Sequence, residues 1–104
     1  MRTHPILCVA FASAAVAFPV FAQQGPSDPQ IAHILVTANQ VDIDAGKLAE
    51  KKASSEDVRK FGQQMVTDHT AVNKQASDLV KKLKVTPQDN DTSKAIKAGG
   101  DKNL

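Results

Sequence analysis

Two stretches of the chain repeat apolar residues at spacings of three and four, the period of an amphipathic helix. In the first, at about residues 29–52, these residues are Ile31, Ile34, Leu35, Ala38, Val41, Ala45, Leu48 and Ala49. In the second, at about residues 55–84, they are Val58, Phe61, Gly62, Met65, His69, Val72, Ala76, Leu79, Val80 and Leu83. Because an α-helix turns by about 100° per residue, each set forms one stripe along its helix. No run alternates apolar and polar residues as a strand does, so the sequence predicts an all-α protein.

Start signals support both helices. Asp28 and Pro29 suit a helix start, since Asp accepts hydrogen bonds from free backbone N–H groups and Pro fits the first helical position. Ser54 or Ser55 is expected to cap the second helix, whose first turn is acidic. The short link between the helices predicts an antiparallel helical hairpin over residues 29–84.

A hairpin of this size leaves much of both stripes in water. Burial of apolar surface stabilises a fold by ~25 cal/mol per Å², and the lost conformational entropy costs ~1.5 kcal/mol per ordered residue. For so small a structure the two nearly cancel. We therefore expect further helices, supplied by a dimer partner or by chain that is missing from this sequence. Residues 85–104 predict a loop and the start of an unfinished C-terminal part, a short helix or loop that Gly99-Gly100 breaks. We expect the chain to be truncated there.

The first 22 residues are typical of a signal peptide. Arg2 precedes an apolar run over residues 6–18, and Val20 and Ala22 occupy the positions that signal peptidase reads, so cleavage is expected after Ala22. The run is shorter than the roughly 20 residues of a permanent membrane span. An uncleaved signal anchor is the alternative. Residues 23–28 then form a polar linker, and the protein is expected to be exported.

Composition removes several function classes. Arg2 is the only charged residue before the cut, which leaves 12 of the 13 basic residues against 11 acidic ones, a net charge of +1. This balance argues against nucleic-acid binding and against strong membrane-surface binding. Phe61 is the only aromatic residue after the cut, whereas nucleic-acid stacking platforms need several. The single cysteine, Cys8, lies in the signal peptide, so the mature chain has no disulfide.

Three pieces of sequence carry a family resemblance: Asp42 followed by "GKLA" at residues 46–49, "SSEDVRKFGQQMVTDHT" at residues 54–70, and the loop proline Pro87. Together they resemble the bacterial exported domain-of-unknown-function family 4142, often labelled "predicted outer membrane protein". The resemblance covers essentially the whole mature chain. It implies a ferritin-like four-helix bundle, of which this chain holds about half, with two further long helices to follow. The family has no established activity, so the resemblance implies no catalytic residues.

Asp42 and His69 are the candidate site residues, because both are ionisable and fall well inside the apolar stripes. Three interpretations are open. The two residues could act as metal ligands or an acid–base pair in the bundle centre. They could instead form one buried polar contact that fixes the helix register, or they could be partly hydrated. An unpaired buried carboxylate costs several kcal/mol, so Asp42 needs a partner or water. A turn near Ala53-Ser54 offsets the two by about four residues, or roughly 6 Å, so a direct hydrogen bond is allowed but not favoured.

Di-iron chemistry has a sharper requirement. Carboxylate-bridged iron bundles need a Glu three residues before the ligating His, and that position holds Val66. Two ligands from two helices also fall short of a closed metal shell. No nucleophile elbow, phosphate-binding glycine loop or Cys/His metal spacing is present in the sequence, and we predict no cofactor.

The remaining polar residues have plain interpretations. Asp68 is expected to be solvated, and His33 is expected on the exposed opposite face of the first helix. The basic residues that could pair with Asp68 are Arg59, Lys60 and Lys74.

Small and apolar residues suggest how the helices pack. Met65 is expected to fill the core, and Gly46 and Gly62 are expected to let two helices approach closely. A second, smaller apolar patch on the back of the first helix packs on a third or fourth helix, or else contacts another envelope protein. This patch consists of Ala32, Val36 and Ile43.

The sequence thus favours an exported, non-enzymatic helical-bundle protein of the periplasm or outer envelope, acting through protein–protein contacts. Its partner would be a second copy in a homodimer or another envelope protein. The alternative is a ferritin-like metal-binding or redox-protective protein to which Asp42 and His69 contribute.

Overall fold

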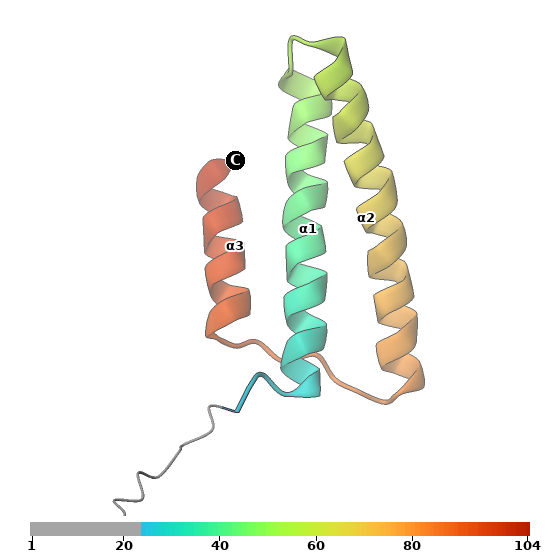
Figure 1. Ribbon diagram of the computed structural model, residues 1–104, viewed down its shortest axis with the longest axis vertical. Coiled ribbons are helices and arrows are strands. Elements are labelled where there is room, and N and C mark those ends of the chain that lie inside the picture. Colours follow the sequence, from blue (N-terminus) through green and yellow to red (C-terminus); the bar gives the residue numbers. More distant parts are fainter. Residues whose placement is uncertain (1–23) are drawn as a thin grey trace, which may run out of the picture.

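The computed structural model describes residues 24–104, which form three helices (Figure 1). α1 spans Asp28–Lys52, α2 spans Glu56–Lys82 and α3 spans Asp91–Asn103. Residues 24–104 contain no strand, so the prediction of an all-α protein is confirmed. The predicted signal peptide, residues 1–22, lies outside the described residues.

The first two helices begin at serine caps. The Ser27 side chain accepts a hydrogen bond from the Gln30 N–H, and the Gln30 side chain accepts one from the Ser27 N–H at 2.9 Å. Ser27 therefore takes the cap position, and the predicted cap, Asp28, lies in the first turn instead. Ser55, one of the two predicted caps of α2, accepts from the Val58 N–H.

α2 ends in a left-handed turn that directs the chain back towards α1. The Val85 N–H donates to the Val80 carbonyl at 2.9 Å, and Lys84 adopts a φ of 55°. This is the hydrogen bond of a Schellman motif, in which glycine is the usual left-handed residue. The Gln88 N–H then donates to the Pro29 carbonyl at 2.9 Å, which ties the loop to the start of α1.

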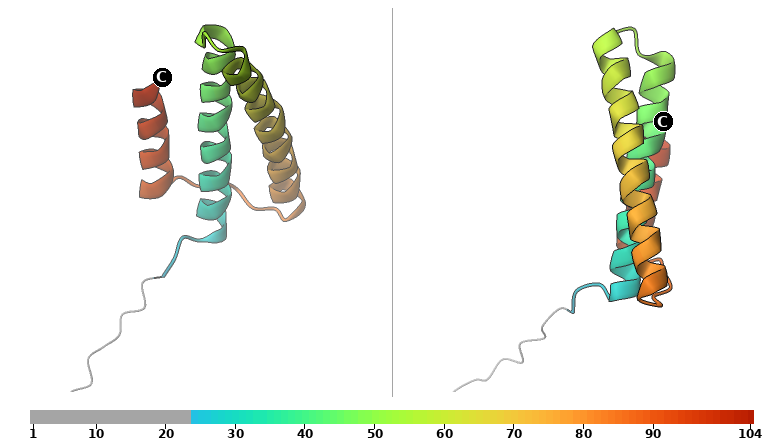
Figure 2. Two further views of the ribbon diagram at one scale, coloured as in Figure 1. Left: turned by 45° about the horizontal axis from the view of Figure 1, so that its top comes forward. Right: turned by 90° about the vertical axis from the view of Figure 1, so that its right-hand side faces the viewer.

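The three helices lie side by side in one layer, with α1 in the middle (Figures 1 and 2). α1 and α2 run antiparallel, whereas α3 packs on the other side of α1 and runs parallel to it. Within the described residues α2 and α3 make no contact with each other. The layer leaves α1 flanked on two sides and α2 flanked on one. None of the helices within residues 24–104 is long and apolar enough to cross a membrane.

A pair of glycines sets the closest approach of α1 to α2. A Cβ atom at Gly46 would lie 2.7 Å from the Gly62 carbonyl oxygen, and a Cβ atom at Gly62 would lie 2.7 Å from the Gly46 carbonyl oxygen. Real Cβ atoms do not approach backbone oxygens so closely, so any side chain would push the helices apart. The predicted role of these two glycines is confirmed.

α3 continues through Gly99 and Gly100, so the prediction that these residues break a helix is wrong. A Cβ atom at Gly100 would lie 2.7 Å from Cγ2 of Val41, so the missing side chain lets α3 rest against α1. Glycine costs a helix about 1 kcal/mol relative to alanine. Here the contact with α1 offsets that local cost.

Much of the predicted apolar stripe of α2 remains in water. Its exposed members are Val58, Phe61, Val72, Leu79 and Leu83, at 40–62% exposure. Gly62 and Ala76 of the same stripe are buried, and Met65 is half-buried. α1 therefore covers only one edge of the stripe.

The smaller apolar patch predicted on α1 does not act as a unit. Ile43 is buried within the layer at 5% exposure. Val36 lines the groove between α1 and α3, whereas Ala32 lines the groove between α1 and α2. Packing on a third helix, one of the two interpretations of the patch, thus applies to only part of it.

Candidate functional site

Asp42 and His69 meet across the α1–α2 contact. His69 Nε2 lies 3.2 Å from Asp42 Oδ2, closer than their positions along the helices suggested. The Asp42 side chain is 47% exposed and the His69 side chain 25% exposed, so the pair is partly hydrated. A direct contact had not been favoured from the sequence, and the structure corrects that expectation.

The direction of the side chains explains the contact. Helical side chains tilt towards the N-terminus of their own helix. In an antiparallel pair, Asp42 therefore leans away from the turn and His69 leans towards it. With Gly46 level with Gly62, the two residues are offset by about three positions, or roughly 4.5 Å. The two tilts together close this offset.

The second ring nitrogen of His69 bonds within α2. Nδ1 lies 2.9 Å from the Met65 carbonyl oxygen, which can only accept, so this contact is a hydrogen bond when Nδ1 carries a proton. Nε2 faces the Asp42 carboxylate, whose ionised form is also an acceptor. Both contacts are hydrogen bonds only when the ring is protonated on both nitrogens. The imidazole thus lies between a backbone acceptor on α2 and a carboxylate on α1.

Two asparagines extend the pair into a polar layer formed by Asn39, Asp42, His69 and Asn73. Asn73 Nδ2 donates to the Val36 carbonyl at 3.5 Å, and Asn39 is 8% exposed. Asn39 Nδ2 and Asn73 Oδ1 are buried and have no hydrogen-bond partner in the described part of the chain. Sequence reasoning missed both residues because it weighed only ionisable groups. Their spacing was the available signal, since each lies one turn from Asp42 or His69 on the same helix face.

The polar layer offers fewer ligands than a metal site usually has. Within residues 24–104, no three or more His, Cys, Asp or Glu side chains lie close enough together to hold a metal ion. Asp42 and His69 could supply at most two ligands, and His69 Nδ1 is already engaged by a backbone carbonyl.

His33 forms a second histidine–aspartate contact, and the expectation that it is simply exposed is wrong. Its Nε2 lies 3.0 Å from Asp89 Oδ1, in the loop before α3, and its side chain is 33% exposed. Ser93, at 1% exposure, donates to the same oxygen at 2.7 Å. That hydrogen bond, with the positive charges of His33 and Lys94, lowers the pKa of Asp89. Because Ser93 bonds to the aspartate and not to the imidazole, the three residues do not activate a nucleophile as a catalytic triad does.

The start of α3 belongs to this cluster. The Asn90 side chain accepts from the Ser93 N–H, and Ser93 Oγ accepts from the Asn90 N–H, both at 2.9 Å. This capping box orients Ser93 towards Asp89, and Asp89 reaches His33 on α1. The cluster therefore ties the N-terminus of α3 to α1.

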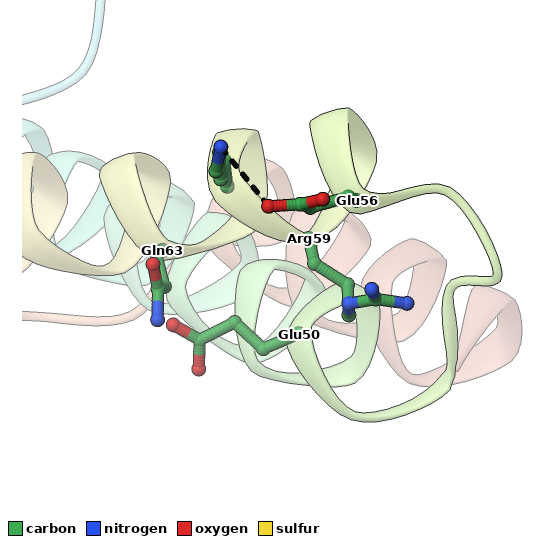
Figure 3. Close-up of a pocket in the computed structure, with 5 residues that line it drawn as sticks. Glu50, Glu56, Arg59 and Gln63 are labelled. Carbon is green, nitrogen blue, oxygen red and sulfur yellow. Dashed lines mark ion pairs between the residues drawn. The ribbon is translucent and has the colours of Figure 1, made fainter.

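A charged cleft lies beside the turn between α1 and α2 (Figure 3). Its lining residues are Glu50, Glu56, Arg59, Lys60 and Gln63. Arg59 donates to the carbonyls of Ala53 and Ser54 at 2.8 and 3.3 Å, which satisfies free acceptors at the end of α1. Lys60 pairs with Glu56 at 3.1 Å. Arg59 thus holds the turn, whereas Lys60 pairs with a neighbour one turn away on α2.

Asp68 is exposed, as predicted. The basic residues suggested as its partners make other contacts: Lys74 pairs with Asp78, Lys60 pairs with Glu56, and Arg59 donates to carbonyls at the turn. Nothing in the geometry of Asp68 gives it a chemical role.

Among the comparisons with known proteins, only the comparison with protein families gives a match. A family model described as "Domain of unknown function (DUF4142)" matches residues 13–102, which include α1, α2 and nearly all of α3. No curated protein matches the chain, and no solved structure matches it.

Proposed function

The chain belongs to the DUF4142 family, and we propose that it is an exported helical protein of the cell envelope that acts through protein–protein contacts. The observation that carries the proposal is the exposed apolar surface of α1 and α2. We call this surface the apolar face, and it consists of Ile31, Leu35, Val58, Phe61, Val72, Leu79 and Leu83.

The apolar face is continuous at the end away from the turn. Ile31 and Leu35 of α1 line the same groove as Leu79 and Leu83 of α2, a cavity of about 260 Å³ with largely apolar walls. Contiguous exposed apolar patches are uncommon on monomers and mark interaction surfaces. Each large apolar side chain moved out of water contributes roughly 1.5–3 kcal/mol, so covering this face favours association.

The likeness to half of a four-helix bundle is part of the same proposal. Two long antiparallel helices with one open apolar face need a second pair of helices to complete such a bundle. A ferritin-like arrangement is what the family resemblance implies. Export to the periplasm or outer envelope is supported by the signal-peptide pattern of residues 1–22.

The polar layer has a structural role in this proposal. Asp42, His69 and the two asparagines lie where only one register of α1 against α2 brings them together, so they select that register. A metal-binding or redox-protective function is the second candidate, and it rests on the Asp42–His69 contact alone. Metal analysis of the purified protein distinguishes the two functions, since only the metal-binding function predicts stoichiometric metal.

The test is site-specific photo-cross-linking in the producing bacterium. A photoreactive phenylalanine analogue replaces Phe61, which is 62% exposed on the apolar face, or Thr67, which is exposed on another side of α2 as a matched control. We expect a covalent protein adduct from position 61 and none from position 67, in the envelope fraction. Retention of the protein in the cytoplasm would overturn export. Equal labelling from both positions, or none, would overturn a contact role for the apolar face.

A further inference from the structure

We propose that the partner of the apolar face is a second copy of this chain, with the two α2 helices antiparallel about a two-fold axis near residues 70–71. This inference rests on the proposed contact function and adds the identity and orientation of the partner. It is carried by the arrangement of exposed apolar and charged residues on α2.

The large apolar residues that remain exposed on α2 and its C-terminal cap form a seam beside the α1 contact. At about 100° per residue, they fall within an arc of roughly 60°. This arc is centred roughly 70° from Gly62, which faces α1. A second helix can therefore lie along the seam without displacing α1. The residues of the seam are Val58, Phe61, Val72, Leu79 and Leu83.

The apolar positions of α2 match themselves when the helix is reversed. A two-fold axis requires that if residue i faces residue j, then j faces i. About residues 70–71, Val58 faces Leu83 of the second copy, and Phe61 faces Leu79 to within one position. A parallel two-fold arrangement would instead set each of these residues against its own copy.

Charges at the outer edge of the seam favour the same orientation. Asp57 near the start of α2 and Lys82 at its end are both exposed, and neither takes part in an ion pair within residues 24–104. The proposed axis brings Asp57 of one copy to within about two residues, or roughly 3 Å along the helix, of the level of Lys82 in the other. The symmetry forms this pair twice. A parallel arrangement would instead place like charges together at both ends.

The neighbouring part of α1 leaves room for the second copy. With Gly46 level with Gly62, Ala38 lies at the level of the proposed axis. A small side chain at this point lets two helical layers approach each other face to face. Two such layers together would form a four-helix core from two copies of α1 and α2.

Charge reversal combined with light scattering tests the proposal. The protein purified from the envelope fraction is expected to be a dimer, and Asp57→Lys or Lys82→Asp alone is expected to weaken it about 10-fold, because each places like charges together twice. The double variant is expected to return the dissociation constant to within about 3-fold of the parent. Thr67→Asp, which adds a charge away from the seam, is the control and should leave the dimer unchanged. Circular dichroism on each sample establishes that the helices are intact.

Cross-linking tests the orientation. A mixture of Val58→Cys and Leu83→Cys proteins should form mixed dimers with a short bismaleimide, whereas each protein alone should not cross-link. Cross-linking of Val58→Cys to itself would overturn the antiparallel arrangement. A monomer at about 100 μM would overturn the second copy as partner. If the Phe61 photo-adduct then contains a different protein, the proposed contact function stands without the dimer.

Discussion

Replacing Gly62 by alanine would place a Cβ atom 2.7 Å from the Gly46 carbonyl oxygen, 3.0 Å from the Ala49 Cβ and 3.2 Å from the Glu50 backbone nitrogen. Two of these three atoms belong to the backbone, so relief requires α1 and α2 to move apart. Overpacking of this kind costs about 1–3 kcal/mol, against a gain of about 1 kcal/mol in helix propensity. We expect a net loss of about 1 kcal/mol in the free energy of unfolding.

Gly99 offers the matched control. A Cβ atom at Gly99 in α3 meets nothing within 4 Å, so alanine there gains helix propensity without a clash. Gly99→Ala is expected to stabilise the protein by about 0.5–1 kcal/mol. The two variants should therefore differ by roughly 2 kcal/mol, and for a domain of this size each kcal/mol shifts Tm by about 4–8 °C.

The assay is urea and thermal unfolding followed by circular dichroism at 222 nm. A double variant, Gly46→Ala with Gly62→Ala, should cost less than the sum of the single variants, because one separation of the helices relieves both clashes. If Gly62→Ala proves as stable as Gly99→Ala, the close approach of α1 to α2 is not what these glycines provide.

Three further predictions concern the polar contacts and the turn after α2. His69→Leu should keep the fold within about 1 kcal/mol of the parent in urea unfolding, since Asp42 is 47% exposed and can turn to water; a loss above about 3 kcal/mol would show that the pair is essential to the fold. Because the pKa of Asp89 is lowered in the folded protein, its contribution to holding α3 is present at neutral pH and is lost as the pH falls through that lowered pKa. Hydrogen exchange of α3 amides should rise at acid pH in the parent, and Asp89→Asn should show the faster exchange already at pH 7; exchange that is independent of both changes would refute this role. Lys84→Gly should raise Tm by a few degrees, because glycine adopts the observed φ of 55° without the roughly 1 kcal/mol that other residues pay, and a lowered Tm would contradict this account.

Local features of the fold were open to prediction because their causes lie within a few residues. The period of apolar residues marked α1 and α2, and Ser55 was identified as a possible cap from its position before an acidic turn. The cap of α1 was misplaced by one residue, because Ser27 and Asp28 are both good caps and only the capping box with Gln30 separates them. Gly46 and Gly62 were also predicted to allow close packing, since glycine within a helix needs a reason outside the helix.

Contacts between elements were harder to foresee. The His33–Asp89 contact depends on a loop that returns to the start of α1, and the sequence pattern does not encode the path of that loop. The direct Asp42–His69 contact depends on the tilt of two side chains, whereas positions along the helix axes alone left a gap. Asn39 and Asn73 went unnoticed because an uncharged amide is conspicuous only once its burial is known.

The sequence by itself determined that the chain is helical, where its second helix starts, and which stripes are apolar, because helical period and capping are local properties. Only the tertiary structure decided which edge of each stripe is covered. The Gly46–Gly62 contact sets the rotation and level of α1 against α2, and the Gly100–Val41 contact places α3 on the opposite side of α1. Apolar residues specify that a surface tends to leave water, whereas close packing of particular atoms selects the neighbour that covers it. For this reason a face of α2 whose apolar pattern predicts burial remains exposed in the fold.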